Sequence, residues 1–226
     1  MDNSEKALSR DEQRARRLLS KAVAGILKQM ARGTGWRSAQ TYLFREHEGW
    51  LVYIDTHVSL LKLSSAANLR IKPLGIDPIF WDIVSLPENN SLPTSFRIFG
   101  AWTCSVPVVH EAQIPPDCSN PETIADYVLR WSSMQLRDIN FQWTTSRFLS
   151  FLQSHPRQKE AAPWLAAEVA TLALLNDDER AIGRCYEACD RKWHGGFTVM
   201  GSSGARSFVD LAIEWFEQRM ADKARH

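Results

Sequence analysis

The stretch Gly49-Trp50-Leu51-Val52-Tyr53-Ile54-Asp55-Thr56-His57-Val58-Ser59-Leu60 decides the fold, because it is the longest β-like segment of the sequence. Apolar residues recur along it at alternate positions, and the positions between them include Asp55 and His57. Successive side chains of a strand point to opposite faces, so this alternation predicts one apolar and one mixed face. We therefore expect the central strand of an antiparallel sheet, with helices packed on the side that carries Trp50.

The composition is that of a folded protein without a strong charge bias. Of 226 residues, 44% are hydrophobic and 23% are charged, and the formal net charge is +1. A nearly neutral chain supplies no global basic field for a nucleic-acid partner. Four scattered cysteines without a Cys-x-x-Cys pair indicate a reducing compartment. A charged N-terminus and the lack of a long apolar run predict a cytoplasmic protein with no membrane partner.

The residues around the central strand predict the rest of the N-terminal half. Apolar residues at three- and four-residue spacing predict one long amphipathic helix over residues 4–31, which Gly33 ends. Further strands are expected at residues 41–46, 69–72 and 95–106, the last because apolar and polar residues alternate there. With the central strand they give a four-stranded antiparallel sheet.

In the C-terminal half the apolar period changes from two to 3.6, which predicts helices. Helices are expected to begin near Asn120, Thr145, Pro163 and Ala205, with a further one around Ile182. We therefore predict an α+β fold in a single domain of residues 1–226. In it, residues 1–116 form the N-terminal helix and the sheet, and residues 117–226 form a helical half packed on them.

Three segments occur in a recognisable order: Tyr42-Leu43-Phe44-Arg45-Glu46, then Gly49-Trp50-Leu51-Val52-Tyr53-Ile54, then Asn68-Leu69-Arg70-Ile71-Lys72-Pro73-Leu74-Gly75. In this order the sequence resembles the bacterial proteins catalogued as domain of unknown function 4304, over roughly residues 5–155. The resemblance implies strands followed by C-terminal helices and a bacterial, cytoplasmic setting. That family has no assigned activity, so the resemblance implies no catalytic residue.

The mixed face of the sheet carries the candidate site. Asp55 and His57 point the same way on one strand, and Arg70 and Lys72 do so on the next. If the two strands are neighbours in a meander, the four side chains lie within reach of one another. An aspartate can orient a histidine as a general base, and two cations can hold an anionic group. The alternative is a solvent-facing sheet surface with ordinary cross-strand ion pairs.

A cysteine pair near the C-terminus has the residue types of a zinc site, but it lies on the apolar side of its predicted helix. Cys185 and Cys189 lie one helical turn apart, and His194 follows. Both cysteines continue the apolar stripe of their helix, and free cysteine is among the most buried residue types. We therefore expect neither a metal nor a cofactor.

The first predicted helix also carries a basic face. Its cations lie mostly away from the apolar stripe, at Arg10, Arg14, Arg17, Lys21 and Lys28. They suggest nucleic-acid binding, and the alternative is a solvated helix face on which Asp11 and Glu12 dilute the positive field.

Three functions follow from these patterns. The sequence has no Gly-x-Ser-x-Gly, His-Glu-x-x-His or Walker motif, and it has nine tryptophans. We therefore expect a non-catalytic interaction or accessory module of the immunity or defence type, with a protein partner. One alternative is a hydrolase or anion-binding enzyme that uses the polar sheet face, and another is a nucleic-acid-binding protein that uses the first helix.

Overall fold

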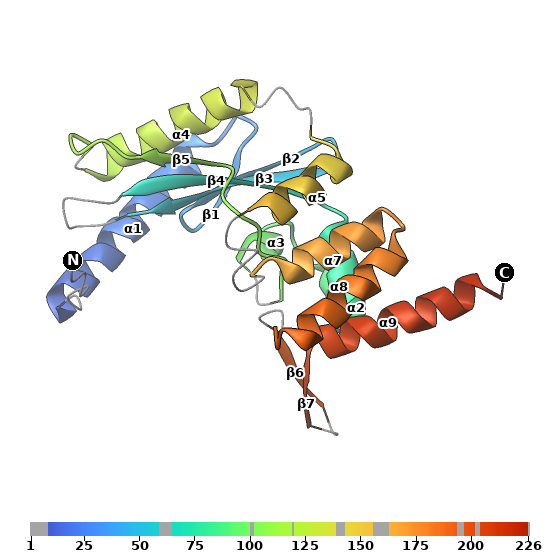
Figure 1. Cartoon of the computed structure of the whole chain (residues 1–226). Helices are drawn as coiled ribbons and strands as arrows, with labels where there is room; N and C mark the ends of the chain where they lie inside the picture. Colours follow the sequence, from blue (N-terminus) through green and yellow to red (C-terminus); the bar gives the residue numbers. More distant parts are fainter. Residues whose placement is uncertain are drawn as a thin grey trace. The chain divides into compact units, whose positions relative to one another are not determined.

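The computed structural model describes residues 9–58, 65–99, 102–118, 120–138, 143–155, 163–193, 197–201 and 204–225. Its strands form a five-stranded antiparallel sheet and a separate two-stranded hairpin, and helices make up most of the remainder (Figure 1). The predicted α+β class is confirmed, but the sheet has five strands where the sequence predicts four.

Contacts within the chain define two compact units, and each is described by itself. The first comprises Met1–His47, Leu51–Ile71 and Val108–Phe141, and the second Glu48–Trp50, Lys72–Pro107 and Gln142–His226. This grouping differs from the predicted division after residue 116. The single domain of residues 1–226 stays a prediction.

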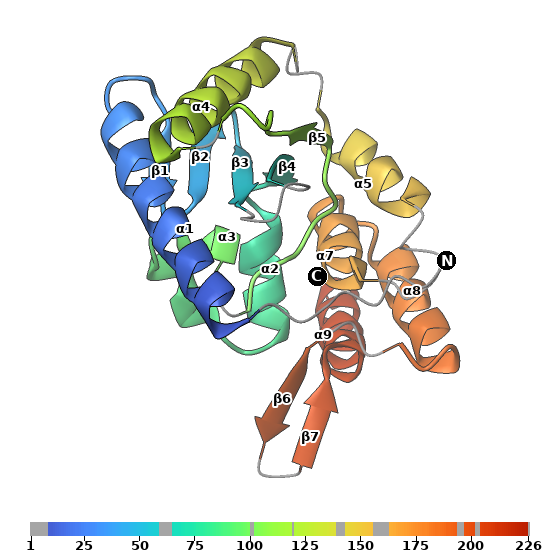
Figure 2. The same ribbon diagram turned by 90° about the vertical axis from the view of Figure 1, so that its left-hand side faces the viewer.

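The first unit consists mainly of the sheet and two long helices. Its elements are α1 (Arg10–Met30), β1 (Arg37–Ala39), β2 (Tyr42–His47), β3 (Trp50–His57), β4 (Ala66–Pro73), β5 (His110–Gln113) and α4 (Pro121–Asp138). The last residues of β4 and the first residue of β3 belong to the second unit. The strands neighbour one another in chain order, so the sheet is a meander. Helices α1 and α4 pack against each other, and Figure 2 shows both beside the sheet.

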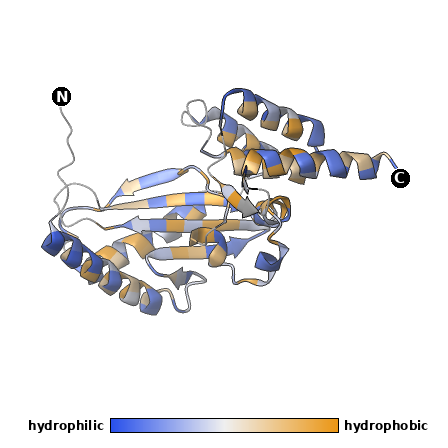
Figure 3. Cartoon of the chain, turned by 90° about the horizontal axis from the view of Figure 1, so that it is seen from below, coloured by the Kyte–Doolittle hydropathy of each residue, from blue (hydrophilic) through white to orange (hydrophobic). Residues whose placement is uncertain are grey.

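The sequence at the start of helix α1 forms an N-terminal capping box. The Ser9 hydroxyl accepts a hydrogen bond from the N–H of Glu12, whose carboxylate accepts one from the N–H of Ser9. This capping box satisfies two N–H groups that the helix leaves unpaired. Along the helix, hydrophilic residues recur between hydrophobic ones (Figure 3). The helix predicted over residues 4–31 is confirmed where the structure describes it, and residues 4–8 lie outside that part.

Two tight turns set the register of the first three strands. β1 and β2 pair antiparallel with Ala39 opposite Tyr42, so residues 40–41 form the first turn. Glu48 and Gly49 have φ angles of 47° and 83° and join β2 to β3. A two-residue turn with both φ angles positive matches the twist of the flanking strands.

Strand β3 is buried on the face that its alternation predicts. Trp50, Val52 and Ile54 are 8%, 0% and 0% exposed, so the prediction of a sealed tryptophan side is confirmed. The Trp50 ring packs against Trp143 and Phe148, with ring centroids 6.2 and 5.9 Å away. Large aromatic surfaces therefore anchor the start of the strand.

The other face of β3 is only partly polar. Leu51 and Tyr53 are buried, Asp55 is half-buried, and His57 is exposed. This face therefore opens to solvent only at the end of the strand. The predicted strand residues 59–60 lie outside the described ranges.

Strand β4 pairs with a short polar strand at the edge of the sheet. β5 runs antiparallel to β4, with Ala66 opposite Gln113 and Leu69 opposite His110. The strand predicted at residues 69–72 therefore begins three residues earlier. No apolar alternation marks β5, so nothing in its sequence predicts it.

The predicted fourth strand over residues 95–106 is wrong where the structure describes it, and residues 100–101 lie outside that part. Residues Phe96–Phe99 form the short helix α3, and residues 102–106 belong to no helix or strand. Phe96 and Phe99 are three residues apart, so they share one face of a helix but would lie on opposite faces of a strand. Backbone bonds to the buried Lys72, described below, fix the path of this segment.

The second unit is built largely from helices. Its elements are α2 (Ile76–Ile83), η1 (Pro87–Ser91), α3, α5 (Thr145–Ser154), α7 (Leu165–Leu174), α8 (Asp178–Asp190), β6 (Thr198–Gly201), β7 (Gly204–Ser207) and α9 (Phe208–Lys223). Helix α7 packs against α2, α5 and α8, and α8 packs against α9. Helix α7 is buried over nearly its whole length, which makes it the centre of this unit.

The helices predicted in this half are confirmed, with one change at the last. The sequence predicts that the final helix starts near Ala205, but residues 204–207 pair with β6 as the second strand of the hairpin. Ser207 then caps α9, whose first residue is Phe208.

Buried carboxylates of the second unit face cations on neighbouring helices. Glu168 on α7 accepts a hydrogen bond from Arg184 on α8 at 3.0 Å. Asp178 at the start of α8 pairs with Arg219 and Lys223 on α9, at 3.0 and 2.6 Å. These pairs fix neighbouring helices relative to one another.

Candidate ligand-binding pocket

An open pocket lies beside α1 at the end of β3, within the first unit. Its volume is about 460 Å³, which is in the range of small-molecule sites. Helix α1 contributes Arg16, Ser20, Lys21 and Ala24; the first turn contributes Gln40 and Thr41; residues 55–58 complete it. We call this feature the β3 pocket.

Arg16 joins the helix to the strand across this pocket. Its Nε donates to the carbonyl of Val58 at 3.1 Å. Its Nη2 lies 3.0 Å from Nε2 and 3.2 Å from Nδ1 of His57. A guanidinium only donates, so the imidazole accepts this hydrogen bond. Sequence reasoning missed Arg16, since 41 residues separate it from His57.

Among the described residues that line the pocket, Asp55 is the only carboxylate. Burial raises the pKa of the Asp55 carboxyl, and the nearby Arg70 and His57 act in the opposite direction. Burial, together with the charge of Asp55, also raises the pKa of Tyr42. Asp55 and Arg70 therefore interact electrostatically, as the sequence predicts for neighbouring strands.

Of the pocket residues that the structure describes, Thr56 alone has a buried polar atom without a hydrogen-bond partner. Its side chain is 3% exposed, and its hydroxyl has no hydrogen-bond partner. Leaving a buried hydroxyl without a partner costs about 1–3 kcal/mol. An ordered water or a hydrogen-bonding group of a bound ligand would meet this need.

Lys72, the fourth predicted site residue, belongs to a different cluster. It is 0% exposed and forms an ion pair with Asp77 on α2, with 2.8 Å between Nζ and Oδ2. The prediction that Lys72 joins Asp55 and His57 in holding an anion therefore does not describe its contacts. An apolar setting at residues 71–76 and an aspartate five positions later were the available signals of a buried pair.

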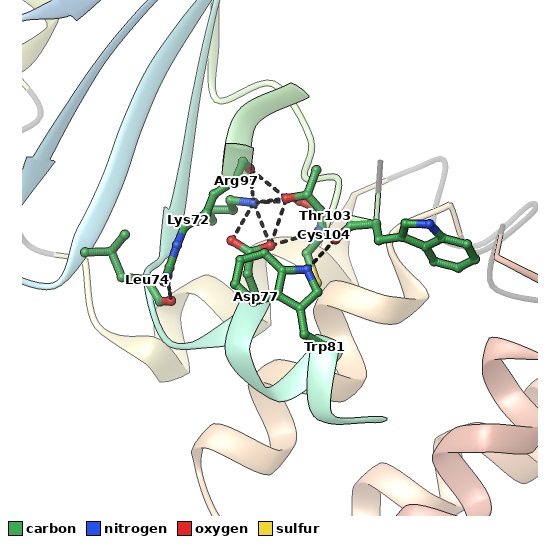
Figure 4. Close-up of polar contacts among 8 residues, drawn as sticks. Lys72, Leu74, Asp77, Trp81, Arg97, Thr103 and Cys104 are labelled. Atoms are coloured by element: carbon green, nitrogen blue, oxygen red, sulfur yellow. Dashed lines mark hydrogen bonds and ion pairs between the residues drawn. The ribbon is translucent and has the colours of Figure 1, made fainter. Parts of the chain in front are cut away.

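The Lys72 ammonium is fully satisfied by its neighbours (Figure 4). Besides Asp77, it donates to the carbonyls of Arg97 and Cys104 at 2.6 and 3.1 Å and to the Thr103 hydroxyl at 2.9 Å. Asp77 Oδ1 in turn accepts from the Thr103 hydroxyl and the N–H of Cys104, both at 2.9 Å. We call these five residues the Lys72 cluster.

The segment that closes this cluster has a strained residue. Trp102 has φ 67°, in the left-handed region that bulky side chains rarely adopt. Its carbonyl accepts a hydrogen bond from the indole of Trp81 at 2.5 Å, and its ring stacks on Phe197. These contacts and the adjacent cluster hold the backbone in this conformation.

The cysteines are free thiols, and two are buried. Burial raises the pKa of Cys185 to about 12, which suppresses thiolate chemistry at neutral pH. Cys189 is exposed, and His194 lies outside the described residues. In the part of the chain that the structure describes, no three His, Cys, Asp or Glu side chains are grouped to hold a metal.

A second pocket of about 330 Å³ lies elsewhere in the first unit. Its lining includes Arg45, His47 and Arg137, with Trp36 beneath. None of its described lining residues has a buried polar atom without a partner. It therefore lacks the unmet hydrogen bond that marks the β3 pocket.

Comparison with known proteins found no match among protein-family models, curated proteins or solved structures. The resemblance to the domain of unknown function 4304 proteins therefore stays a prediction. Among helices in the described ranges, none has the length and hydrophobicity to cross a bilayer.

Proposed function

We propose that this protein is a binding module whose β3 pocket takes a small ligand with an anionic group. The buried, unpartnered hydroxyl of Thr56 carries the proposal. Proteins rarely leave such a group unsatisfied, and a bound ligand is a direct way to satisfy it.

The cations of the pocket indicate the charge of the ligand. In the described part of the lining, two cations, Arg16 and Lys21, outnumber the one carboxylate, Asp55, so this lining favours an anion. The hydroxyls of Ser20 and Thr41 supply further hydrogen bonds to an oxyanion such as phosphate or carboxylate.

Binding fits the geometry better than hydrolysis does. A general-base role for His57 calls for a carboxylate that orients the ring. Instead, its ring nitrogens face the guanidinium of Arg16. No hydrogen bond joins Asp55 to His57 within the described ranges.

The interaction-module hypothesis loses one of its supports. Exposed tryptophan would favour a protein interface, but all nine tryptophans are buried or half-buried. An immunity or defence role with a protein partner, and a bacterial, cytoplasmic setting, stay proposals that only the sequence supports.

Titration with inorganic phosphate and glycerol 3-phosphate, followed by amide chemical shifts, tests the proposal. We expect saturable shifts at residues 55–58 at millimolar concentrations. Arg16→Gln should weaken binding by about 10-fold or more, because a hydrogen bond to a charged group contributes about 1.5–3 kcal/mol.

Arg14→Gln is the matched control, because it removes the same charge from the same helix outside the pocket lining. It should leave the affinity within about twofold. An equal loss in both variants would mean that general electrostatics binds the anion. Absence of shifts with both probes would contradict the proposal.

A further inference from the structure

The outer face of α1 carries a straight row of cations. At about 100° per residue, Arg10, Arg14, Arg17, Lys21 and Lys28 fall within an arc of about 60°. The row is about 27 Å long at 1.5 Å per residue. We call these five residues the α1 ridge.

The fold presents this ridge to solvent. Val23 and Leu27, on the opposite side of the helix, are 0% exposed, whereas all five ridge residues are exposed. The capping box at Ser9 fixes the start of the helix. The ridge is therefore held outward by the burial of the apolar stripe.

The ridge cations lack partners, unlike most other arginines that the structure describes. No salt bridge or hydrogen bond involves a ridge side chain within the described part of the chain. By contrast, Arg184 and Arg219 bind buried carboxylates, and the exposed Arg130 and Arg191 pair with acids on their own helices. No ion pair neutralises the ridge, although the carboxylates of Asp11 and Glu12 in the first turn reduce its positive field there.

We propose that the α1 ridge binds the phosphate backbone of double-stranded nucleic acid without reading its sequence. A linear row of unpaired cations complements a linear array of phosphates. Helix α1 has no aromatic residue to stack on bases, so the contact is to the backbone.

The buried stripe of α1 argues against a membrane as the partner. A helix that lies in a bilayer surface inserts its apolar face among the lipids. Here Val23 and Leu27 are already packed inside the protein, and Leu18 is the one large hydrophobic residue of α1 that is exposed.

The test measures binding to a fluorescent DNA duplex of about 20 base pairs as a function of salt. Each neutralised phosphate contributes about −0.9 to the slope of log K against log salt, so five cations predict a slope of about −4 to −5. The triple variant Arg10→Gln, Arg14→Gln and Arg17→Gln should flatten the slope by about 3 and bind more weakly. These changes also remove positive charge near the helix N-terminus, so the helix should still form.

The matched control is Arg130→Gln, Arg191→Gln and Arg225→Gln, which changes the net charge equally at exposed sites off the ridge. It should keep the slope within about one unit of the wild type. Equal loss in both triples, or no duplex binding at low salt, would overturn the proposal. So would binding of phosphatidylserine vesicles in place of duplex.

The result is separable from the pocket proposal. Arg16 lies about 120° around the helix from Arg10, so Arg16→Gln should weaken phosphate binding in the pocket and spare duplex binding. Lys21 contributes to both features and is left unchanged.

Discussion

The β3 pocket and the Lys72 cluster are both polar, yet they differ in how fully their groups are satisfied. Lys72 meets a carboxylate, two carbonyls and a hydroxyl with no exposure to water. In the pocket, the buried Thr56 hydroxyl meets nothing. In the Lys72 cluster, Asp77 Oδ2 lacks a hydrogen bond, but the ammonium of Lys72 lies 2.8 Å from it. The cluster therefore has little hydrogen-bonding capacity left for a ligand, whereas the Thr56 hydroxyl still has all of its own.

This difference separates charged residues that serve the structure from those that serve a site. A charged residue alone, such as Lys72 or Asp55 in the sequence, does not reveal its role. The role is revealed by the number of hydrogen bonds that the residue can still form. That number depends on residues distant in sequence. Three substitutions test the distinction.

Lys72→Met should have the largest effect. It leaves the Asp77 carboxylate buried without its cation, and breaking a buried pair costs about 3–5 kcal/mol of unfolding free energy. Urea denaturation measures the loss. Lys28→Met, which removes an exposed lysine from α1, should change stability by less than about 0.5 kcal/mol.

A loss below about 1 kcal/mol in Lys72→Met would contradict the structural role of the cluster. The double variant Lys72→Met and Asp77→Leu gives a second measure. It should recover part of the loss, because no charge is then left buried alone.

Thr56→Val should have a smaller effect of opposite sign. It removes the unpartnered hydroxyl at nearly constant shape, so the unliganded protein should gain up to about 1 kcal/mol. The control is Thr171→Val, since the buried Thr171 hydroxyl donates to the Ala167 carbonyl at 2.5 Å. That variant should lose about 1 kcal/mol in the same urea experiment.

If Thr56→Val loses as much stability as Thr171→Val, the Thr56 hydroxyl has a partner after all. The unmet hydrogen bond would then no longer support a ligand site. A gain in stability together with weaker phosphate binding is the expected combination.

Asp55→Asn should have the smallest effect, visible as a dependence on pH. Burial raises the pKa of Asp55 in the folded state above its unfolded value. The folded state then holds the proton more tightly, so stability from this group is present at low pH. It is lost as pH rises from the unfolded to the folded pKa.

Asp55→Asn lacks this dependence. Its melting temperature, compared with that of the wild type, should increase as pH rises through this acidic window and then level off. A difference that stays constant with pH would show that Asp55 titrates normally.

Much of the fold was predictable because local patterns and tertiary structure agree. The alternation of β3 and the 3.6-residue period of α4, α5, α7 and α8 gave elements that the structure confirms. β5 could not be predicted, since a polar edge strand is held by backbone bonds to β4 rather than by its own side chains.

The strand prediction for residues 95–106 was wrong for a different reason. Their alternation predicts a strand, but the buried ammonium of Lys72 requires carbonyl and hydroxyl oxygens around it. The carbonyls of Arg97 and Cys104 and the hydroxyl of Thr103 meet that need, and a straight strand would not bring them together. The hydrogen bonds that the distant Lys72 requires therefore decided the conformation of this segment, against its local alternation of apolar and polar residues.

The candidate site was half predictable. Asp55 and His57 share a strand face, so their proximity follows from period two. Arg16 reaches them from another element, and the orphaned hydroxyl of Thr56 is defined by what fails to lie near it. Neither the contact of Arg16 nor the missing partner of Thr56 can be predicted from a single sequence.

The enclosure of Lys72 has a practical consequence. Acylating reagents label amines that water can reach, so the lysines on α1 should be labelled quickly in the native protein while Lys72 stays unlabelled. Its labelling would require the segment that contains Trp102 to detach from α2. The rate at which mass spectrometry detects acylated Lys72 would therefore time the opening of that part of the second unit.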